Sequence, residues 1–509
     1  MLARIYSAAV IGIEAQSIEV EVDFSMGLAT FSIVGLPDKA ISESKERIRA
    51  ALKNSGYEFP LRAITVNLAP AHLKKQGAVF DMPIVIGLLL AAGHFQQVRD
   101  YLAEALFVGE VALDGAIKPV AGVLAVADYV RSTGKKRLFV PQANAAEAAL
   151  VEGIEVFGVA TLAQLCSHLS GEQLLTPEPA QFARSFQEAE ARCKKSDLSE
   201  VRGQLQAKRA LVIAAAGHHN LIMVGSPGAG KTMLAERFAG LLPPLTFAEI
   251  IAITKVYSVA GLLEGRSLLT RRPVRSPHHT ISQAGLIGGG SSPRPGEVSL
   301  AHHGVLFLDE LTEFSRSTIE VLRQPMESGM VHISRAQQAV QYPADFLLIA
   351  AMNPCPCGYF GDQKRCHCSP HQVRTYLGKI SGPLLDRIDL HVGLRAPLYS
   401  EISPAVVQDV QQESSASCAA RVLAARAVQK KRGQTFLNGQ LSGEEVERYC
   451  VASPAAAQLI QASFDKLGLS MRGYHKMLKI ARTIADLAAS EMIEVAHMQE
   501  ALGFRMLAR

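Results

Sequence analysis

The sequence predicts an α/β protein whose central domain is a parallel sheet covered by helices. Three observations lead to this fold class. Short apolar runs of strand length alternate with helical stretches through most of the chain. One of these apolar runs ends in a glycine-rich turn that leads into a helix, and another ends in two adjacent carboxylates. The C-terminal part shows helical periodicity alone, which indicates a helical domain after the sheet.

The length and composition agree with a multidomain globular protein. The chain has 509 residues, of which 48% are hydrophobic and 19% charged. At about 150 residues per domain, this length suggests about three domains. The apolar content excludes a disordered chain and a small disulfide-stapled scaffold. The net charge of +5 is too low for a surface that wraps a polyanion, but it permits a local basic channel.

Two apolar runs near the N-terminus are interpreted as buried core. Met82–Gly93 is shorter than the roughly 20 residues of a membrane span. Ile5–Ile13 is followed by no small-residue cleavage site, so we expect no signal peptide. We therefore expect a cytoplasmic protein with reduced thiols and no membrane partner.

Residues 1–175 are expected to form an independent α/β domain, and the polar residues 176–197, with two prolines, to form a linker. The expected strands of this first domain are Ser17–Phe24, Thr65–Leu68, Ala105–Val108 and Arg137–Val140. Its expected helices are Ile41–Ser55, Ile84–Ala92 and Leu124–Ser132.

Residues 198–395 are expected to contain the parallel sheet, and residues 396–509 to form a helical domain. The apolar strands Leu221–Val224, Val305–Leu308 and Phe346–Ala351 are separated by helices, as in sheets that are covered on both faces. In the helical domain, Ser470 is expected to cap a helix with one apolar face. That face comprises Met477, Leu478, Ala481, Ile484, Ala485 and Ala488.

The strongest motif is a P-loop that follows the strand Leu221–Val224 and precedes the helical run Met233–Gly240. Its glycines allow successive backbone N–H groups to point at phosphate oxygens, and the next helix adds its dipole. Lys231 is expected to neutralise the β- and γ-phosphates, and Thr232 to bind Mg²⁺. The motif consists of Gly225, Ser226, Pro227, Gly228, Ala229, Gly230, Lys231 and Thr232.

The second half of this site is expected at the ends of two further strands. Asp309 and Glu310 follow the apolar run Val305–Leu308, at the sheet edge where ligands bind. Asp309 is expected to hold Mg²⁺, and Glu310 to orient and deprotonate the attacking water. Asn353 follows the third strand and is expected to help place that water, although Asn before proline also suits a turn.

These motifs together resemble the AAA+ ATPases. The segment Gly382–Asp389 resembles the arginine-finger segment of the branch that contains replicative helicases and magnesium chelatase. This resemblance implies that Arg387 reaches the nucleotide of a neighbouring subunit, and that Arg472 is the sensor-2 arginine. It also places Gly203 and Gln204 beside the adenine and implies a hexameric ring. Without the resemblance, both arginines would be read as surface salt-bridge partners.

Two insertions in the second domain are candidates for contact with a polyanion. The segment Arg266–Leu300 is basic and loop-like, with five arginines against one glutamate. Residues of about 331–342 alternate in the manner of a hairpin with a polar tip. The first insertion resembles the helix-2 insert (about 257–300) and the second resembles the pre-sensor hairpin, both of which line the pore in helicase members. The alternative for the first insertion is a solvated loop, and the alternative for the second is an edge hairpin with a solvated tip. The predicted DNA contacts are Arg335, Arg271, Arg272, Arg275 and Arg294.

A cysteine cluster follows Asn353 directly, within residues 355–368. Cys355, Cys357, Cys366 and Cys368 can form a closed tetrahedral site for structural Zn²⁺. The spacing is CxC twice and not the commoner CxxC. His367 and His371 are alternative ligands, and reduced or redox-active thiols are the alternative to a metal site.

The N-terminal domain resembles the protease domain of the Lon family, a ribosomal S5 domain 2-like fold. The resemblance rests on the segments Ser7–Phe24, Phe31–Ser55, Gly77–Leu90 and Gly109–Ala125. Asp81 stands where that family has its serine, and Val126 lies near the position of its lysine. Neither residue can perform the chemistry of that dyad, so the domain is expected to be proteolytically inactive.

Over its whole length the chain resembles the magnesium-chelatase-like AAA+ family. The resemblance implies an ATPase whose hydrolysis of ATP drives a hexameric DNA helicase. It further implies branch migration on single-stranded and branched DNA during homologous recombination in natural transformation, with recombination proteins as possible partners. The alternative is a metal-chelatase-type AAA+ motor subunit. A third hypothesis, an ATP-dependent protease, conflicts with the missing dyad.

Overall fold

The computed structural model describes residues 2–180, 186, 197–263, 266–290, 293–335, 338–396, 413–467 and 470–505. The chain divides into two compact units. Unit 1 comprises Met1–Arg192, Phe247–Thr270 and Ser334–Tyr342; unit 2 comprises Cys193–Thr246, Arg271–Ile333 and Pro343–Arg509. Most of the predicted linker, and residues 397–412 of the predicted helical domain, lie outside the described residues.

The first sheet of unit 1 has the strand order β1-β2-β4-β3. Its strands are β1 (Ala3–Ile11), β2 (Glu14–Ser25), β3 (Phe31–Val34) and β4 (Ala63–Ala69). β1 and β2 form an antiparallel hairpin with Val10 opposite Ala15, and β3 runs parallel to β4. The sequence predicts β2 and β4. It indicates only buried core for the apolar run that contains most of β1, so this strand was not predicted.

The second sheet of unit 1 is parallel, with the order β5-β8-β9, and it is accompanied by a short antiparallel pair, β6-β7. These strands are β5 (Ala105–Phe107), β6 (Glu110–Val111), β7 (Ile117–Lys118), β8 (Arg137–Pro141) and β9 (Glu155–Val159). The helices are α1 (Lys39–Ser42), α2 (Ser44–Asn54), α3 (Asp81–Ala91), α4 (Arg99–Ala103), α5 (Val123–Ser132), α6 (Ala145–Ala148) and α7 (Leu162–Ser170). Every residue of α3 is buried, which confirms that this apolar run is core.

Helix α11 (Phe247–Ala260) belongs to unit 1, although the sequence-based boundaries place it between residues 198 and 395. It packs against α5, and Lys255 Nζ lies 2.5 Å from the Asp128 carboxylate of that helix. The Ser258 hydroxyl bonds to the buried Glu147, and the Ser258 carbonyl accepts a bond of 3.0 Å from Gly122 N–H. Such contacts link segments far apart in sequence, so helical periodicity alone does not reveal them.

Unit 2 is built on a sheet with the order β11-β14-β17-β10-β18, in which every pairing is parallel. Its strands are β10 (Leu221–Gly225), β11 (Val274–Arg275), β14 (Val305–Leu308), β17 (Leu347–Met352) and β18 (Leu390–Leu394). The predicted parallel sheet is therefore confirmed. Because its strands run in one direction, the residues that follow β10, β14 and β17 all lie at one edge.

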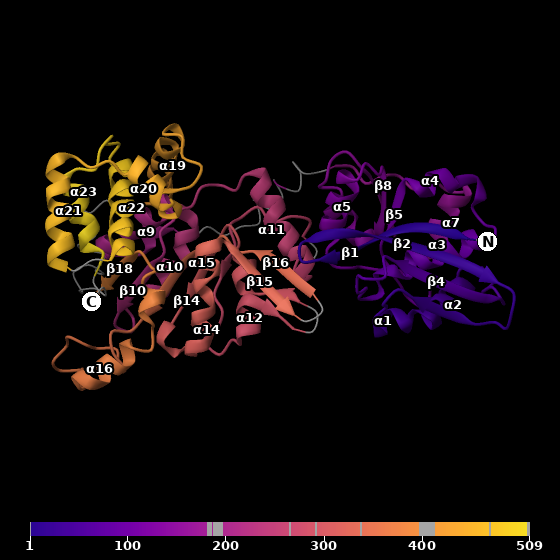
Figure 1. The fold of residues 1–509 in the computed structure, drawn as a ribbon, viewed down its shortest axis with the longest axis horizontal. Helices are drawn as coiled ribbons and strands as arrows, with labels where there is room; N and C mark the ends of the chain where they lie inside the picture. Colours follow the sequence, from indigo (N-terminus) through magenta and orange to yellow (C-terminus); the bar gives the residue numbers. More distant parts are fainter. Residues whose placement is uncertain are drawn as a thin grey trace. The chain divides into compact units, whose positions relative to one another are not determined.

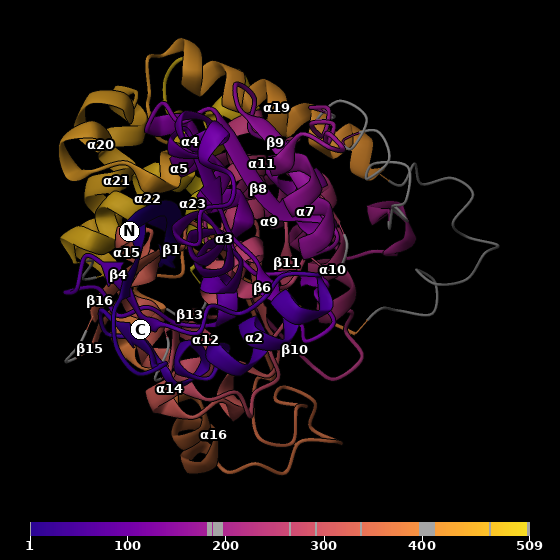
Figure 2. The same ribbon diagram turned by 90° about the vertical axis from the view of Figure 1, so that its right-hand side faces the viewer.

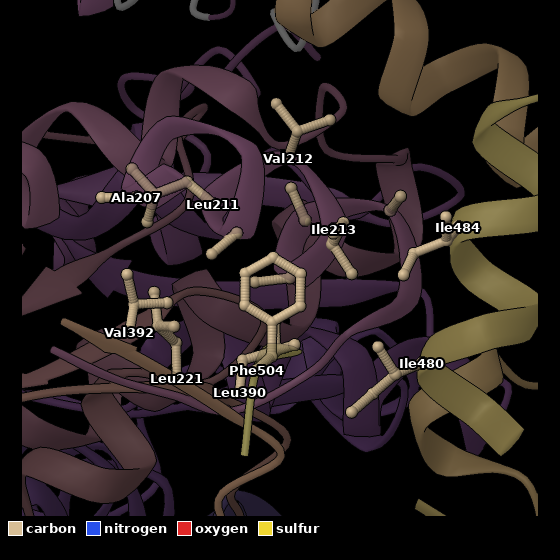
Figure 3. Packing of buried hydrophobic residues seen from close by; sticks show 14 of the residues in the cluster. Ala207, Leu211, Val212, Ile213, Leu221, Leu390, Val392, Ile480, Ile484 and Phe504 are labelled. Atoms are coloured by element: carbon tan, nitrogen blue, oxygen red, sulfur yellow. The ribbon is translucent and has the colours of Figure 1, made fainter. Parts of the chain in front are cut away.

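Among the described residues, seven helices of unit 2 share a core with this sheet. The helices in this core are α9 (Leu205–Gly217), α10 (Lys231–Phe238), α19 (Ser415–Lys431), α20 (Gly443–Tyr449), α21 (Pro454–Leu467), α22 (Met471–Leu487) and α23 (Val495–Gly503). Unit 2 also contains α14 (Arg316–Glu320), α15 (Pro325–Ser328), α16 (Pro370–Leu377) and α17 (Gly382–Leu385). Figure 3 shows side chains of α9, β10, β18 and α22 converging around Phe504. Figures 1 and 2 show α20, α21 and α22 gathered together, with α16 at the far edge of the unit.

Helix α22 confirms the predicted cap and apolar face. The Ser470 hydroxyl accepts a bond of 3.1 Å from the Gly473 N–H. Five of the six predicted apolar positions are buried, and Ala488 instead ends the helix as an exposed residue. The cap and the periodic face are local features, which explains why the sequence predicts them well.

The basic insert is more regular than its composition predicts. Residues of this segment form β11, α12 (Gln283–Ile287), the antiparallel pair β12 (Gly288–Gly289) and β13 (Arg294–Pro295), and α13 (Glu297–Leu300). The second insertion forms the hairpin β15 (Met330–Arg335) and β16 (Gln338–Pro343). The segment Arg266–Leu300 thus contains short helices and strands between its turns, and β11 pairs with β14 of the central sheet.

In the part of the chain that the structure describes, no single helix has the length and hydropathy of a membrane span. The bent pair Ala78–Ala91 and Gln96–Ala103 together reach that length and hydropathy, with an angle of 117° between them.

Candidate nucleotide-binding site

The P-loop joins the carboxyl end of β10 to the first turn of α10. Gly228 and Gly230 have φ angles of +78° and +90°, a conformation that favours glycine over residues with a Cβ. A Cβ on Gly225 would lie 2.8 Å from the Leu394 carbonyl oxygen, so the loop begins where β10 and β18 leave no space for a side chain. This local geometry gives the loop the tight turn that a phosphate-binding nest requires.

The side chain of Lys231 lies within the loop that it closes. Its Nζ donates to the carbonyls of Gly225, at 2.7 Å, and Ser226, at 3.1 Å. It also donates to Asn353 Oδ1 at 3.0 Å, which brings together residues that follow β10 and β17. Burial lowers the pKa of Lys231, while the nearby carboxylates of Asp309 and Glu310 oppose this effect.

The carboxylates after β14 lie beside the P-loop. Thr232 Oγ1 donates to Asp309 Oδ2 at 2.8 Å, and the other Asp309 oxygen accepts the Glu310 N–H at 2.9 Å. Glu310 has a φ of +51° and a side chain that is 58% exposed. A hydroxyl and a carboxylate oxygen at this distance suit one octahedral Mg²⁺ that keeps several water ligands. The donor set therefore fits the predicted Mg²⁺.

His279, from the basic insert, lies close to Glu310. Its Nδ1 is 3.6 Å from Glu310 Oε2. In the sequence, this histidine stands out only as part of a basic segment. No local motif indicates the contact, because it depends on the pairing of β11 with β14 in the sheet.

The predicted adenine-side residues also lie at the P-loop. Gly203 and Gln204 have φ angles of +66° and +54°. The Gln204 amide donates to the carbonyls of Ala229, at 3.2 Å, and Arg395, at 2.7 Å. This side chain therefore ties the start of α9 to the phosphate-binding loop.

Arg387 and Arg472 are brought together at Glu327, away from the P-loop. Arg387 Nη2 lies 2.7 Å from Glu327 Oε1, and the Arg472 guanidinium contacts the same oxygen. Partial burial raises the pKa of Glu327, but the two arginines lower it more, so the pKa is below its usual value. A cavity of about 970 Å³ contains all three side chains, and its described lining includes no residue of the P-loop.

The predicted DNA contacts differ in their surroundings. Arg275 forms a bidentate ion pair with Glu297, at 2.6 and 2.8 Å, and Arg272 donates to the carbonyls of Pro243 and His303. Arg275 therefore joins two parts of the insert, and Arg272 ties the insert to the segments on either side of it. Arg271 and Arg294 are exposed, and the side chain of Arg335, at the end of β15, lies outside the described residues. Contact with DNA stays a prediction for all of these residues.

The cysteine segment, residues 355–368, brings its four thiol groups close together. The sulfur atoms of Cys355, Cys357, Cys366 and Cys368 all lie within 4.8 Å of one another. Zn–S bonds of about 2.3 Å in a tetrahedron place sulfur atoms about 3.8 Å apart, so the four residues fit a zinc ion. A hydrogen bond from the Tyr359 backbone lowers the pKa of Cys357 to about 6, whereas burial and the neighbouring thiols raise the pKa of Cys366 and Cys368.

The same segment contacts the P-loop through Gly358. This residue has a φ of +85°, and a Cβ at its position would lie 2.7 Å from the Pro227 ring. It would also lie 3.8 Å from the Asn353 side chain. The cysteine segment therefore supports the P-loop from the side of Asn353.

In unit 1, Asp81 is 1% exposed at the start of α3. Burial raises the pKa of Asp81 to about 6, although the Arg47 guanidinium, at 2.9 and 3.1 Å, acts to lower it. Val126 is buried in α5 and offers no titratable group. The two positions that the Lon resemblance singles out thus carry a buried ion pair and an apolar side chain.

The fold and this site define a P-loop protein of the AAA+ class. Family models of magnesium chelatase subunit ChlI match three consecutive parts of the chain. They are "Subunit ChlI of Mg-chelatase" over residues 20–144, "Magnesium chelatase, subunit ChlI" over residues 197–402, and the C-terminal model of that subunit over residues 412–505.

The chain belongs to the magnesium-chelatase-like AAA+ family, an ATPase family, in the group that contains YifB and ComM. It is 42% identical to the protein YifB of Escherichia coli over 510 residues, which cover 100% of this chain and 98% of that protein. It is equally 42% identical to the competence protein ComM of Haemophilus influenzae, over 509 residues with the same coverage. The magnesium-chelatase 67 kDa subunit of Chlorobaculum parvum is 27% identical over 160 residues, 31% of this chain and 23% of that protein.

Proposed function

We propose that this protein is an ATP-dependent hexameric DNA helicase or translocase that promotes branch migration during homologous recombination in natural transformation. The observation that carries the proposal is full-length similarity to the competence protein ComM, joined to a P-loop site in which Lys231 contacts Asn353 and Thr232 contacts Asp309. The similarity links the chain to competence, and the site supplies the means to convert ATP hydrolysis into work.

The chemistry assigns a role to each residue of the site. The P-loop amides and Lys231 bind the phosphates of ATP, and Thr232 and Asp309 hold Mg²⁺. Mg²⁺ bound there supplies charge neutralisation for the phosphates. Glu310 orients and deprotonates the attacking water, with Asn353 placing it. Arg387 and Arg472 contribute from a neighbouring subunit, where their charge stabilises the transition state.

The DNA is expected to pass through the pore of the ring. The exposed Arg271 and Arg294, together with Arg335 at the hairpin tip, are suited to sequence-independent contact with phosphates. Unit 1 is proposed to be an inactive Lon-like domain that contacts DNA or a recombination protein. The buried Arg47–Asp81 pair supports this reading, since a serine nucleophile has no counterpart at Asp81.

We also propose that Cys355, Cys357, Cys366 and Cys368 hold one structural Zn²⁺. The convergence of four sulfur atoms supports a closed site without a coordination position for substrate. The ion would hold the segment that carries Gly358 against the P-loop.

The proposed function is tested on three-way and four-way DNA junctions. Lys231→Ala should abolish ATP hydrolysis and junction unwinding, because the phosphates lose their cation. Glu310→Gln should retain ATP binding but lower kcat by about 100-fold or more, since general base catalysis contributes on the order of 10²–10⁴. Lys118→Ala, an exposed lysine of unit 1, is the control and should behave like the unchanged protein. Unwinding that survives Lys231→Ala would refute the motor mechanism.

A metal-chelatase motor subunit is the second candidate. The match to chelatase family models and the 160-residue similarity to a chelatase subunit favour it. The test is to supply the protein and ATP to the remaining magnesium-chelatase subunits with a porphyrin and Mg²⁺. Metal insertion without any DNA-stimulated ATPase would favour the chelatase role over the helicase.

A further inference from the structure

A single carboxylate in unit 2 binds Arg387 and Arg472, the two arginines that the proposed function places between subunits. Glu327 lies in α15, Arg387 follows α17, and Arg472 is in the first turn of α22. Both guanidiniums contact the same atom, Glu327 Oε1. We propose that Glu327 is a positioning residue, which holds Arg387 and Arg472 side by side so that both meet one phosphate group of a neighbouring subunit's nucleotide.

The electrostatics of the cluster require such a residue. Two guanidinium ions that share one oxygen lie within a few ångströms of each other, and like charges at this separation repel. The ionised Glu327 offsets this repulsion, and the arginines in turn hold its pKa below the usual value. An amide at position 327 keeps the shape of the side chain but removes the charge that keeps the arginines together.

The three side chains are held to different degrees. Arg387 is only 10% exposed, and its Nη1 donates to the Pro383 carbonyl at 2.6 Å, so this arginine has little freedom. Arg472 is 53% exposed and forms its ion pair with Glu327. Loss of the Glu327 carboxylate is therefore expected to free the Arg472 side chain more than that of Arg387, which keeps its hydrogen bond to the Pro383 carbonyl.

The direction in which the pair faces indicates whose nucleotide it serves. The cavity of about 970 Å³ that contains the pair is lined, among the described residues, by Lys476 and Lys479 but not by Lys231, Thr232, Asp309 or Glu310. The arginines are thus separated from the P-loop of their own chain, and a phosphate that reaches them comes from a second copy. This inference rests on the proposed function, because it requires an oligomeric ATPase.

The expected kinetic effect follows from the role of orientation. A catalytic group displaced by about 1 Å loses on the order of 100-fold in rate. Glu327→Gln should therefore lower kcat for ATP by about 10-fold to 100-fold and leave KM nearly unchanged, because the binding loop lies elsewhere. Glu327→Asp, which restores the charge on a shorter arm, should recover part of the lost rate.

Mixed assemblies separate positioning from a general structural defect. Glu327→Gln subunits, with an intact P-loop, are mixed in equal amounts with Lys231→Ala subunits, whose Glu327, Arg387 and Arg472 are intact. Where a Lys231→Ala subunit supplies its arginines to a Glu327→Gln neighbour, ATPase should recover well above that of either variant alone. Arg387→Ala mixed with Lys231→Ala is the reference, and Glu413→Gln is the matched control. Glu413 pairs with Arg421 at 2.9 Å and is 47% exposed, against 45% for Glu327.

Each result decides the proposal. Reduced kcat with recovery in the mixture supports it, provided that Glu413→Gln leaves the ATPase unchanged. Wild-type or faster hydrolysis by Glu327→Gln overturns it, as does recovery for Arg387→Ala but not for Glu327→Gln. Recovery for neither variant overturns the arrangement between subunits and, with it, this part of the proposed function.

Discussion

Gly358 is the residue at which the cysteine segment touches the P-loop. Its φ is +85°, and a Cβ added there would lie only 2.7 Å from the Pro227 ring, so there is no space for a side chain. Gly361, in the same segment, has a φ of +96°, but a Cβ there would meet no atom within 4 Å. Substitution of either glycine therefore strains the backbone, but only a side chain at position 358 would also press against the P-loop.

We expect Gly358→Ala to weaken ATP binding by about tenfold, because Pro227 must move and the loop amides lose their alignment. Gly361→Ala should cost about 1 kcal/mol of stability from its positive φ, with no effect on ATP affinity. The measurement is fluorescence titration with a labelled ATP analogue, alongside thermal unfolding of both variants. Equal ATP affinity in the two variants would contradict a supporting role for Gly358.

At the scale of the element, the cysteine segment lies between Asn353 and α16. It has no strand or long helix of its own to hold its shape before α16, so a metal ion is a suitable source of order. The four sulfur atoms already lie within 4.8 Å of one another. A zinc ion would therefore act on the P-loop through Gly358.

Elemental analysis of the purified protein should find one zinc per chain. Changing Cys357 and Cys366 to serine should remove the ion, and lower both the thermal stability and the affinity for ATP. The double change Cys166→Ser and Cys450→Ser alters two buried thiols outside the cluster and should leave the zinc content unchanged. Full zinc content after the loss of Cys357 and Cys366 would contradict this ligand set.

At the scale of the whole molecule, the cavity that contains Glu327, Arg387 and Arg472 has no residue of the P-loop in its described lining. We propose that a single chain therefore holds parts of two sites, so that the active species needs neighbouring subunits. Two compact units form each chain, and α11 and the hairpin tip are grouped with unit 1 although they lie between segments of unit 2.

ATPase activity per chain should fall steeply on dilution, since each site needs a second subunit. With Glu310→Gln and ATP, light scattering after size exclusion should give six times the mass of one chain. Arg387→Ala should assemble in the same way but hydrolyse ATP about 10³-fold more slowly. Constant activity per chain across the dilution series, with the mass of a monomer, would argue against a ring.

Much of the fold and of the site was predictable because the signals are local. The P-loop is eight consecutive residues, and the strands that precede Gly225, Asp309 and Asn353 are apolar runs of ordinary length. By contrast, β11 has only two residues and is a strand only because it pairs with β14. Periodicity does not detect an element of that length, so the sequence indicates only a basic, loop-like segment there.

The sequence by itself determined the parallel α/β core, the P-loop, the paired carboxylates, the cap of α22 and the family. Each of these depends on neighbouring residues or on a buried periodic face. Only the tertiary structure decided that Glu327 joins Arg387 and Arg472, that Gly358 rests against Pro227, and that α11 belongs to unit 1. These contacts join residues from separate segments, and their energies depend on distances that are set only when the chain is folded.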